Sequence, residues 1–357
     1  MAAGAALVGM FAMTTGLVRA YTSARAALAE TYFQEGRDFT AQGRYEQAID
    51  QYRRAISFSP ADSQYRLLLA QALVETGRLA EAQAHLDELH DEDPTDAVVN
   101  LALARIYAKE NDVNDAVAWY HRAIYGLWSE NPQQSRINAR WELIQFLAGH
   151  DERRQVIAEL LQLFSEAPDD ARQRLKIGRM LLGFGAVANA EEVFEDVVNT
   201  NPRFVDGWSA LADAQMGDGK YAEARNSLRR AWRLAPHDGG IWNRLETVNQ
   251  ILALDPTLPT LTSAERFSRS RELLERCVAV IEECATTQNK TLAAQQQADI
   301  AAAQGFLQPK RRAPAEGQTP QALSLALELW QDRAQLCGST APDPALAAVL
   351  AMIEKQQ

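Results

Sequence analysis

Apolar and polar positions along most of the chain repeat at the spacing of short amphipathic helices. Small or compact apolar residues recur at intervals of 34, 34, 40, 34 and 34 residues, at Ala48, Ala82, Ala116, Val156, Ala190 and Ala224. Prolines give the same period and the same six-residue insertion, at Pro60, Pro94, Pro168, Pro202 and Pro236. Because the two series agree, they predict an array of helix pairs with one six-residue insertion, which lies within residues 126–136.

Each repeat carries residues that let two antiparallel helices pack closely. With Ala29 as the first residue of the first repeat, the eighth position is small except at Ile144, namely at Gly36, Ala70, Ala104, Gly178 and Ala212. Larger apolar residues at the eleventh and twenty-fourth positions predict a core between neighbouring pairs. The expected turns hold residue types that tolerate left-handed backbone, Gly43, Gly77, Asn111, Asp151, Gly185 and Gly219.

This pattern resembles the tetratricopeptide repeat family over residues 29–238, as six units, followed by a half unit that ends before Asp255. The resemblance implies an all-α protein built as a right-handed helical-repeat solenoid. The sequence outside the repeats adds an N-terminal hydrophobic helix and a C-terminal helical cap. We expect three parts: a hydrophobic anchor or signal segment at 1–28, the solenoid at 29–256 and a helical capping region at 257–357. The family binds peptides and proteins of many kinds, so the resemblance implies a scaffold and leaves the partner open.

The first residues predict membrane targeting. Residues 2–18 contain no charge, and Arg19 and Arg25 follow. A stretch of 17 residues is at the lower limit of about 17–25 for a membrane-spanning helix. An uncleaved anchor and a cleaved secretory signal are the two functional alternatives, and an Ala-rich soluble helix is the third. Arg19 and Arg25 would prefer the cytoplasmic side of a membrane, which argues against an anchor whose following domain is exported. The orientation of an anchor therefore stays open.

Charge and motifs exclude several functions. Lys and Arg number 36 against 47 Asp and Glu, a formal charge of −11, which argues against nucleic acid as a partner. The sequence has no CxxC pair, no GxSxG and no HExxH, and its five histidines are scattered. We therefore predict no enzyme, no catalytic or metal site, no cofactor and no small-molecule substrate.

The family resemblance also implies candidate partner-binding residues. Positions that line the inner groove of such repeats hold Arg105, Lys109, Arg172, Lys176 and Arg179. Basic residues there predict a partner protein or peptide with an acidic or carboxylate-bearing segment. The alternative is that they pair with neighbouring Glu and Asp. Leu101 and Glu142 depart from the clamp that holds chaperone tails, so a chaperone tail is not assigned.

The C-terminal quarter predicts capping helices and a possible disulfide. Helices are expected from Ser263, over 290–306, over 321–336 and over 344–355, with Cys284 and Cys337 near two helix ends. If those ends lie on one side of the cap, an oxidising periplasm would join the two thiols; in a reducing cytoplasm both would stay free. This pair is the reason for placing the solenoid on the periplasmic side.

Two further alternatives stay open. The insertion, with Tyr125 and Trp128, is either a contact point or packing that covers the irregular fourth unit. The function is that of a membrane-associated scaffold for complex assembly, or of a permanent structural subunit of a larger membrane complex. An enzyme is a distant third.

Overall fold

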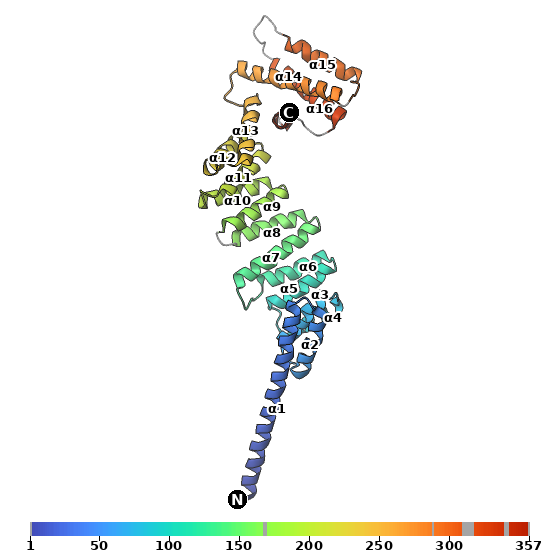
Figure 1. Ribbon diagram of the computed structural model, residues 1–357, viewed down its shortest axis with the longest axis vertical. Helices are drawn as coiled ribbons and strands as arrows, with labels where there is room; N and C mark the ends of the chain where they lie inside the picture. Colours follow the sequence, from blue (N-terminus) through green and yellow to red (C-terminus); the bar gives the residue numbers. More distant parts are fainter. Residues whose placement is uncertain (1, 167–169, 288, 309–317, 339–342, 356–357) are drawn as a thin grey trace. The chain divides into compact units, whose positions relative to one another are not determined.

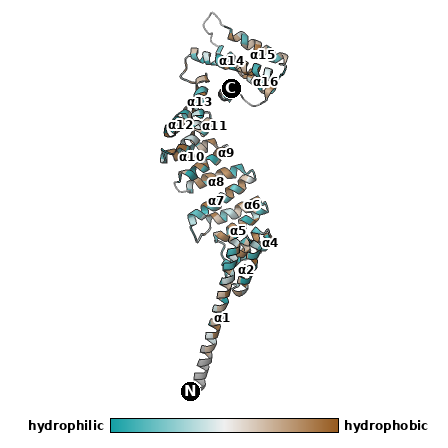
Figure 2. Cartoon of the chain, viewed as in Figure 1, coloured by the Kyte–Doolittle hydropathy of each residue, from teal (hydrophilic) through white to brown (hydrophobic). Residues whose placement is uncertain are grey.

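The computed structural model describes residues 2–166, 170–287, 289–308, 318–338 and 343–355, with side chains from Phe11 onward except at 12. The chain forms two compact units, residues 1–167 and 168–357, which are described separately. Helices account for nearly all of the described residues (Figure 1). Hydrophilic and hydrophobic residues are interspersed along most of them, as expected for amphipathic helices (Figure 2).

The first unit contains eight helices in its described part, α1 (Ala2–Ala41), α2 (Tyr45–Phe58), α3 (Ser63–Glu75), α4 (Leu79–Glu92), α5 (Ala97–Lys109), α6 (Val113–Tyr125), α7 (Pro132–Gly149) and α8 (Arg153–Glu166). The described part of the second unit contains nine, α9 (Ala171–Gly183), α10 (Val187–Thr200), α11 (Val205–Gly217), α12 (Tyr221–Leu234), α13 (Gly239–Leu254), α14 (Ser263–Thr287), α15 (Ala294–Leu307), α16 (Gln318–Cys337) and α17 (Pro344–Lys355). The all-α helical-repeat solenoid predicted from the sequence is confirmed.

The helix starts follow the predicted repeat. First helices of the pairs begin at the expected residue in α3, α5, α9, α11 and α13. Four of these five follow an aspartate whose side chain accepts hydrogen bonds from the first backbone N–H groups, at Asp62, Asp96, Asp170 and Asp238. The chain thus sets four of these five helix starts with the same local chemistry, and α11 follows Phe204 instead.

The turn residues adopt the predicted left-handed backbone. All six have positive φ angles between 58° and 78°, namely Gly43, Gly77, Asn111, Asp151, Gly185 and Gly219. The small eighth position lets a large side chain from the second helix come close. A Cβ on Gly36 would lie 2.5 Å from the Tyr52 ring, for example.

The fourth repeat departs from the prediction at its start. Its first helix, α7, begins at Pro132 rather than at 137, because proline fits the first turn, where its missing N–H is not needed. Only residues 126–131 therefore stay outside helices. They pair with the turn before α5: Leu127 N donates to Thr95 O at 2.8 Å, and Ala97 N donates to Leu127 O at 3.2 Å. Trp128 donates from its indole nitrogen to Ala123 O at 3.0 Å.

The last four helices form the expected cap. Thr262 and Glu265 make a reciprocal capping box at the start of α14, with Thr262 N donating to the carboxylate at 2.8 Å. Helix α15 begins at Ala294, later than expected, and α16 begins earlier, at Gln318. Leu273, Leu329 and Leu346 are fully buried in a core that α14–α17 share with α13. The cap is therefore continuous with the last half repeat of the second unit.

Helix α1 is longer than its repeat requires. Its part before Ala29 exposes apolar side chains, with Phe11 74%, Met13 78% and Leu17 73% accessible. Among the residues that the structure describes, no helix combines the length and the apolar character needed to cross a membrane.

Candidate functional site

The five predicted groove residues are divided between the two units. Arg105 and Lys109 lie on α5 in the first unit; Arg172, Lys176 and Arg179 lie on α9 in the second. The site is therefore described one helix at a time.

The two basic residues of α5 are engaged by neighbours. Arg105 donates to both carboxylate oxygens of Glu142, at 2.9 Å and 2.6 Å. This carboxylate raises the pKa of the Arg105 guanidinium above its ordinary value. Lys109 donates to Val74 O at 3.1 Å and lies 3.9 Å from the Glu75 carboxylate. Both cations already have anionic partners, so a ligand would have to compete for them.

Helix α9 presents three of its four basic residues to solvent. Arg172, Lys176 and Arg179 are exposed, while Leu175 and Leu181 are buried on the other face. The helix is thereby fixed by its apolar side and offers positive charge on its polar side. For Arg172, no partner of the guanidinium lies among the described residues.

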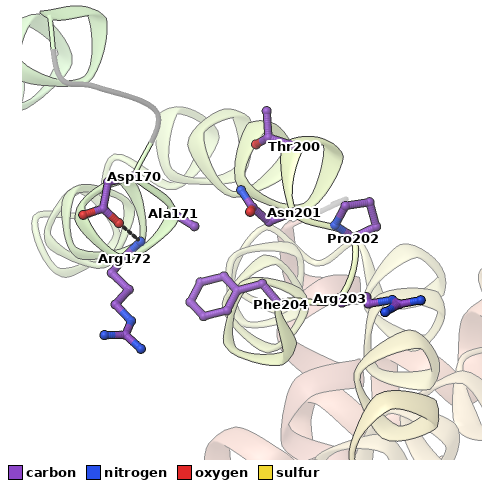
Figure 3. Close-up of a pocket in the computed structure, with 8 residues that line it drawn as sticks. All are labelled: Asp170, Ala171, Arg172, Thr200, Asn201, Pro202, Arg203 and Phe204. Carbon is purple, nitrogen blue, oxygen red and sulfur yellow. Dashed lines mark hydrogen bonds between the residues drawn. The ribbon is translucent and has the colours of Figure 1, made fainter.

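Arg172 stands at the edge of a surface pocket of about 920 Å³. The pocket lies between the start of α9, the end of α10 and the start of α11, and is lined by Asp170, Ala171, Arg172, Thr200, Asn201, Pro202, Arg203 and Phe204 (Figure 3). The ring of Phe204 points toward the side on which Arg172 lies, whereas Arg203 points away.

The chemistry of this pocket combines a cation with an aromatic ring. Asp170 accepts a hydrogen bond from the backbone N of Arg172 at 2.9 Å, which anchors the helix start. A guanidinium binds carboxylates through paired N–H groups, and a half-buried ring such as that of Phe204 offers apolar contact. The pocket can therefore hold a segment that has a carboxylate next to an apolar side chain.

Sequence reasoning missed the part of this pocket that follows α10. Asn201, Pro202 and Phe204 form the link from α10 to α11, and only the helix-stopping role of Pro202 was assigned. A large aromatic residue directly before the first helix of a repeat could have identified it, because none of the other repeats has one there.

The structure joins Cys284 to Cys337 in a disulfide, with their Cα atoms 6.3 Å apart. Helices α14 and α16 end at Thr287 and Cys337, so the bond links two helix ends. Cys277 is free and buried, and burial raises the pKa of its thiol to about 12. Oxidation of the pair in the native compartment stays a prediction.

Metal-ligating side chains do not cluster in the part of the chain that the structure describes: no group of three His, Cys, Asp or Glu residues could hold a metal ion there.

Comparison with known families identifies the repeat. The family model described as tetratricopeptide repeat matches residues 39–90 and 80–126. These matches fall on the helix pairs whose period, turns and packing are described above. Over residues 39–126 the chain is therefore similar to the tetratricopeptide repeat family. Repeats of this family have the fold of a protein-interaction scaffold.

Curated relatives of this chain are distant. Human Protein O-mannosyl-transferase TMTC1 is 25% identical over 194 residues, which are 54% of this chain and 18% of the relative. Anaphase-promoting complex subunit 3 of Schizosaccharomyces pombe is 26% identical over 149 residues, 42% of this chain and 22% of the relative. The chain thus matches about a fifth of the length of either protein. The solved structure of pilF from Pseudomonas aeruginosa is 13% identical with a TM-score of 0.40, covering 62% of this chain and 98% of that chain.

Proposed function

We propose that the protein is a membrane-associated scaffold without catalytic activity that recruits a partner protein through an acidic segment bound at α9. The observation that carries this function is the exposed guanidinium of Arg172 beside the ring of Phe204, at the edge of a pocket of about 920 Å³. Lys176 and Arg179 extend the positive surface along the same helix. Arg105 and Lys109 are secondary candidates, since each has an anionic neighbour.

The preference for an acidic segment follows from charge. A chain with net charge −11 repels acidic partners in general, so a local basic surface is needed to bind one. Opposite charges on the two partners would also speed their encounter, and added salt would slow it.

Charge reversal tests this function. Arg172→Glu with Lys176→Glu should abolish capture of an acetylated peptide that carries glutamates beside a leucine, while the circular dichroism spectrum stays unchanged. The matched control is Arg229→Glu with Arg233→Glu on α12, which has the same change and spacing away from the pocket. Equal capture by the α9 variant and the wild type at physiological salt would remove the site.

Membrane association is the second part of the proposal. It rests on the uncharged stretch at residues 2–18 and on the exposed apolar side chains of α1, such as Phe11 and Leu17. The pairing of Cys284 with Cys337 supports the further proposal that the repeats lie on the periplasmic side. Deletion of residues 2–24 should release the protein from the membrane fraction of its native host. If the full chain is already found only in the soluble fraction, this part is wrong.

A permanent subunit of a larger membrane complex is the alternative function, favoured by the apolar surface that α1 leaves exposed. Gentle solubilisation and size-exclusion chromatography distinguish the two: a fixed set of co-purifying proteins supports the subunit, and exchangeable partners support the scaffold.

A further inference from the structure

A second pocket, of about 360 Å³, occupies the equivalent position of a repeat in the first unit. It lies between the start of α3, the end of α4 and the start of α5. Its residues Gln64 and Asp96 stand where Arg172 and Phe204 stand in the other pocket, 108 residues further along the chain. The two pockets thus share their backbone framework and differ in the side chains that line them.

The lining of this pocket is apolar on one side and acidic on the other. Leu67, Leu89 and Val98 contribute aliphatic groups, and Glu92, Asp93 and Asp96 contribute carboxylates. Arg66 already binds Glu92 at 2.8 Å, so the charge of Glu92 is compensated. The two aspartates carry the negative charge of the pocket.

Both aspartates are held in place through one oxygen and leave the other available. Asp93 Oδ1 accepts from the backbone N and the hydroxyl of Thr95, at 2.9 Å and 2.7 Å. These hydrogen bonds keep the pKa of Asp93 below its ordinary value, so it is ionised at neutral pH. Asp96 Oδ1 caps α5 by accepting from the N–H groups of Val98 and Val99. For neither aspartate does Oδ2 have a partner among the described residues.

The insertion at 126–131 completes this pocket. It is held to residues 95 and 97 by the two backbone hydrogen bonds of Leu127, and it brings Ser129 to the pocket lining. The six extra residues occur once in the repeats, so the Arg172 pocket lacks this wall. The insertion therefore both fixes the segment that carries Asp96 and narrows the opening.

We propose that this pocket binds a segment of a partner protein that carries a lysine or arginine next to an aliphatic side chain. The aliphatic side chain packs against Leu67, Leu89 and Val98, and the cation lies at the free oxygens of Asp93 and Asp96. The negative net charge of the chain attracts such a segment. This second site goes beyond the proposed function, because it uses the other unit and selects the opposite charge.

Three capped peptides test the proposal on the full chain. The first carries two lysines and two leucines; the second has glutamates in place of the lysines; the third has serines in place of the leucines. The measurements use the Arg172→Glu, Lys176→Glu variant, which removes the α9 site. In this background fluorescence anisotropy should detect binding of the first peptide alone, weakened by added salt.

The double variant Asp93→Asn, Asp96→Asn removes both charges but keeps oxygen atoms that accept the capping hydrogen bonds. It should weaken binding of the lysine peptide by about fivefold to tenfold. Ser129→Lys, which leaves the caps untouched, should weaken it similarly by adding positive charge at the wall. Asp112→Asn is the matched control, because Asp112 caps α6 outside the pocket, accepting from Asp115 N at 3.1 Å.

Several results would overturn the site. They are no binding of the lysine peptide to the wild-type chain, equal binding of the glutamate peptide in the Arg172→Glu, Lys176→Glu background, or full binding of the lysine peptide by both pocket variants. Self-association of the wild type that the double variant loses would make a second copy the occupant, which also overturns the proposal. Arg172→Glu with Lys176→Glu should leave lysine-peptide binding intact, so failure of the α9 site is distinguished from failure of this one.

Discussion

The ring of Phe194 occupies the space that a side chain at Gly178 would need. A Cβ built on Gly178 would lie 2.8 Å from two ring atoms, Cδ1 and Cζ, closer than real carbon contacts. In the second repeat the equivalent positions hold a different pair, Ala70 and Leu86, and both residues are fully buried. The size of the residue on the first helix thus depends on the size of its neighbour on the second.

This dependence predicts a change of sign. Gly178→Ala should lower the free energy of unfolding by about 1–2 kcal/mol through overpacking. In a Phe194→Leu background the same change should raise it by about 0.5–1 kcal/mol, because alanine favours helix and the space is free. Urea unfolding of the four proteins measures both. Gly183→Ala is the control, since nothing lies within 4 Å of its added Cβ. Destabilisation by Gly178→Ala in both backgrounds would contradict the packing described.

A buried ion cluster in the first unit predicts sensitivity to acid. Arg140, whose side chain is 1% exposed, lies 2.5 Å from Glu159 and 3.1 Å from Glu166. Burial raises the pKa of Glu159, but His121 and Arg140 outweigh it and hold that pKa below the ordinary value of 4.5. The stabilisation is therefore complete above pH about 4.5 and is lost as the pH falls through the lowered pKa.

Between about pH 5 and pH 3, the variant Glu159→Gln should accordingly lose less stability than the wild type. Thermal unfolding scans at the two pH values measure this loss. Arg140→Met should cost about 3 kcal/mol at neutral pH, because it leaves the partly buried carboxylates of Glu159 and Glu166 without the buried cation between them. The same acid slope in wild type and Glu159→Gln would show that Glu159 has no role in it.

The cysteine pair predicts a covalent link in the protein isolated from its native host. Mass spectrometry after alkylation without reduction should find a Cys284–Cys337 peptide, with Cys277 alkylated only after unfolding because it is buried. Cys284→Ser with Cys337→Ser should cost about 2–4 kcal/mol of stability. Alkylation of all three thiols, in protein freshly isolated from the native host and then unfolded without reduction, would instead place the second unit in a reducing compartment.

The repeat was predictable from the sequence because its determinants are local. A small residue, a left-handed turn residue and a helix-stopping proline each act within a few positions, so α9 and α11 begin where the period placed them. The start of α7 was not predicted, because the insertion and the helix compete for the same residues and Pro132 favours the helix.

The candidate site was less predictable because its partners are distant in sequence. Arg105 and Arg172 look alike as basic residues on a first helix, yet Glu142, 37 positions from Arg105, neutralises one of them. The pocket beside Arg172 depends on the link that follows α10, almost a whole repeat later. Periodicity identifies equivalent positions; it does not show which of them are already occupied by a neighbouring side chain.

The disulfide at the ends of α14 and α16 has a mechanical consequence. When the protein is pulled from its two ends, force passes from Cys284 to Cys337 through the sulfur atoms and bypasses the segment between them. The two positions are 53 residues apart in sequence. At about 3.5 Å per extended residue, roughly 180 Å of chain is shielded from the load. A reducing agent would return that length to the stretched chain, so the extensibility of the second unit is set by the redox state around it.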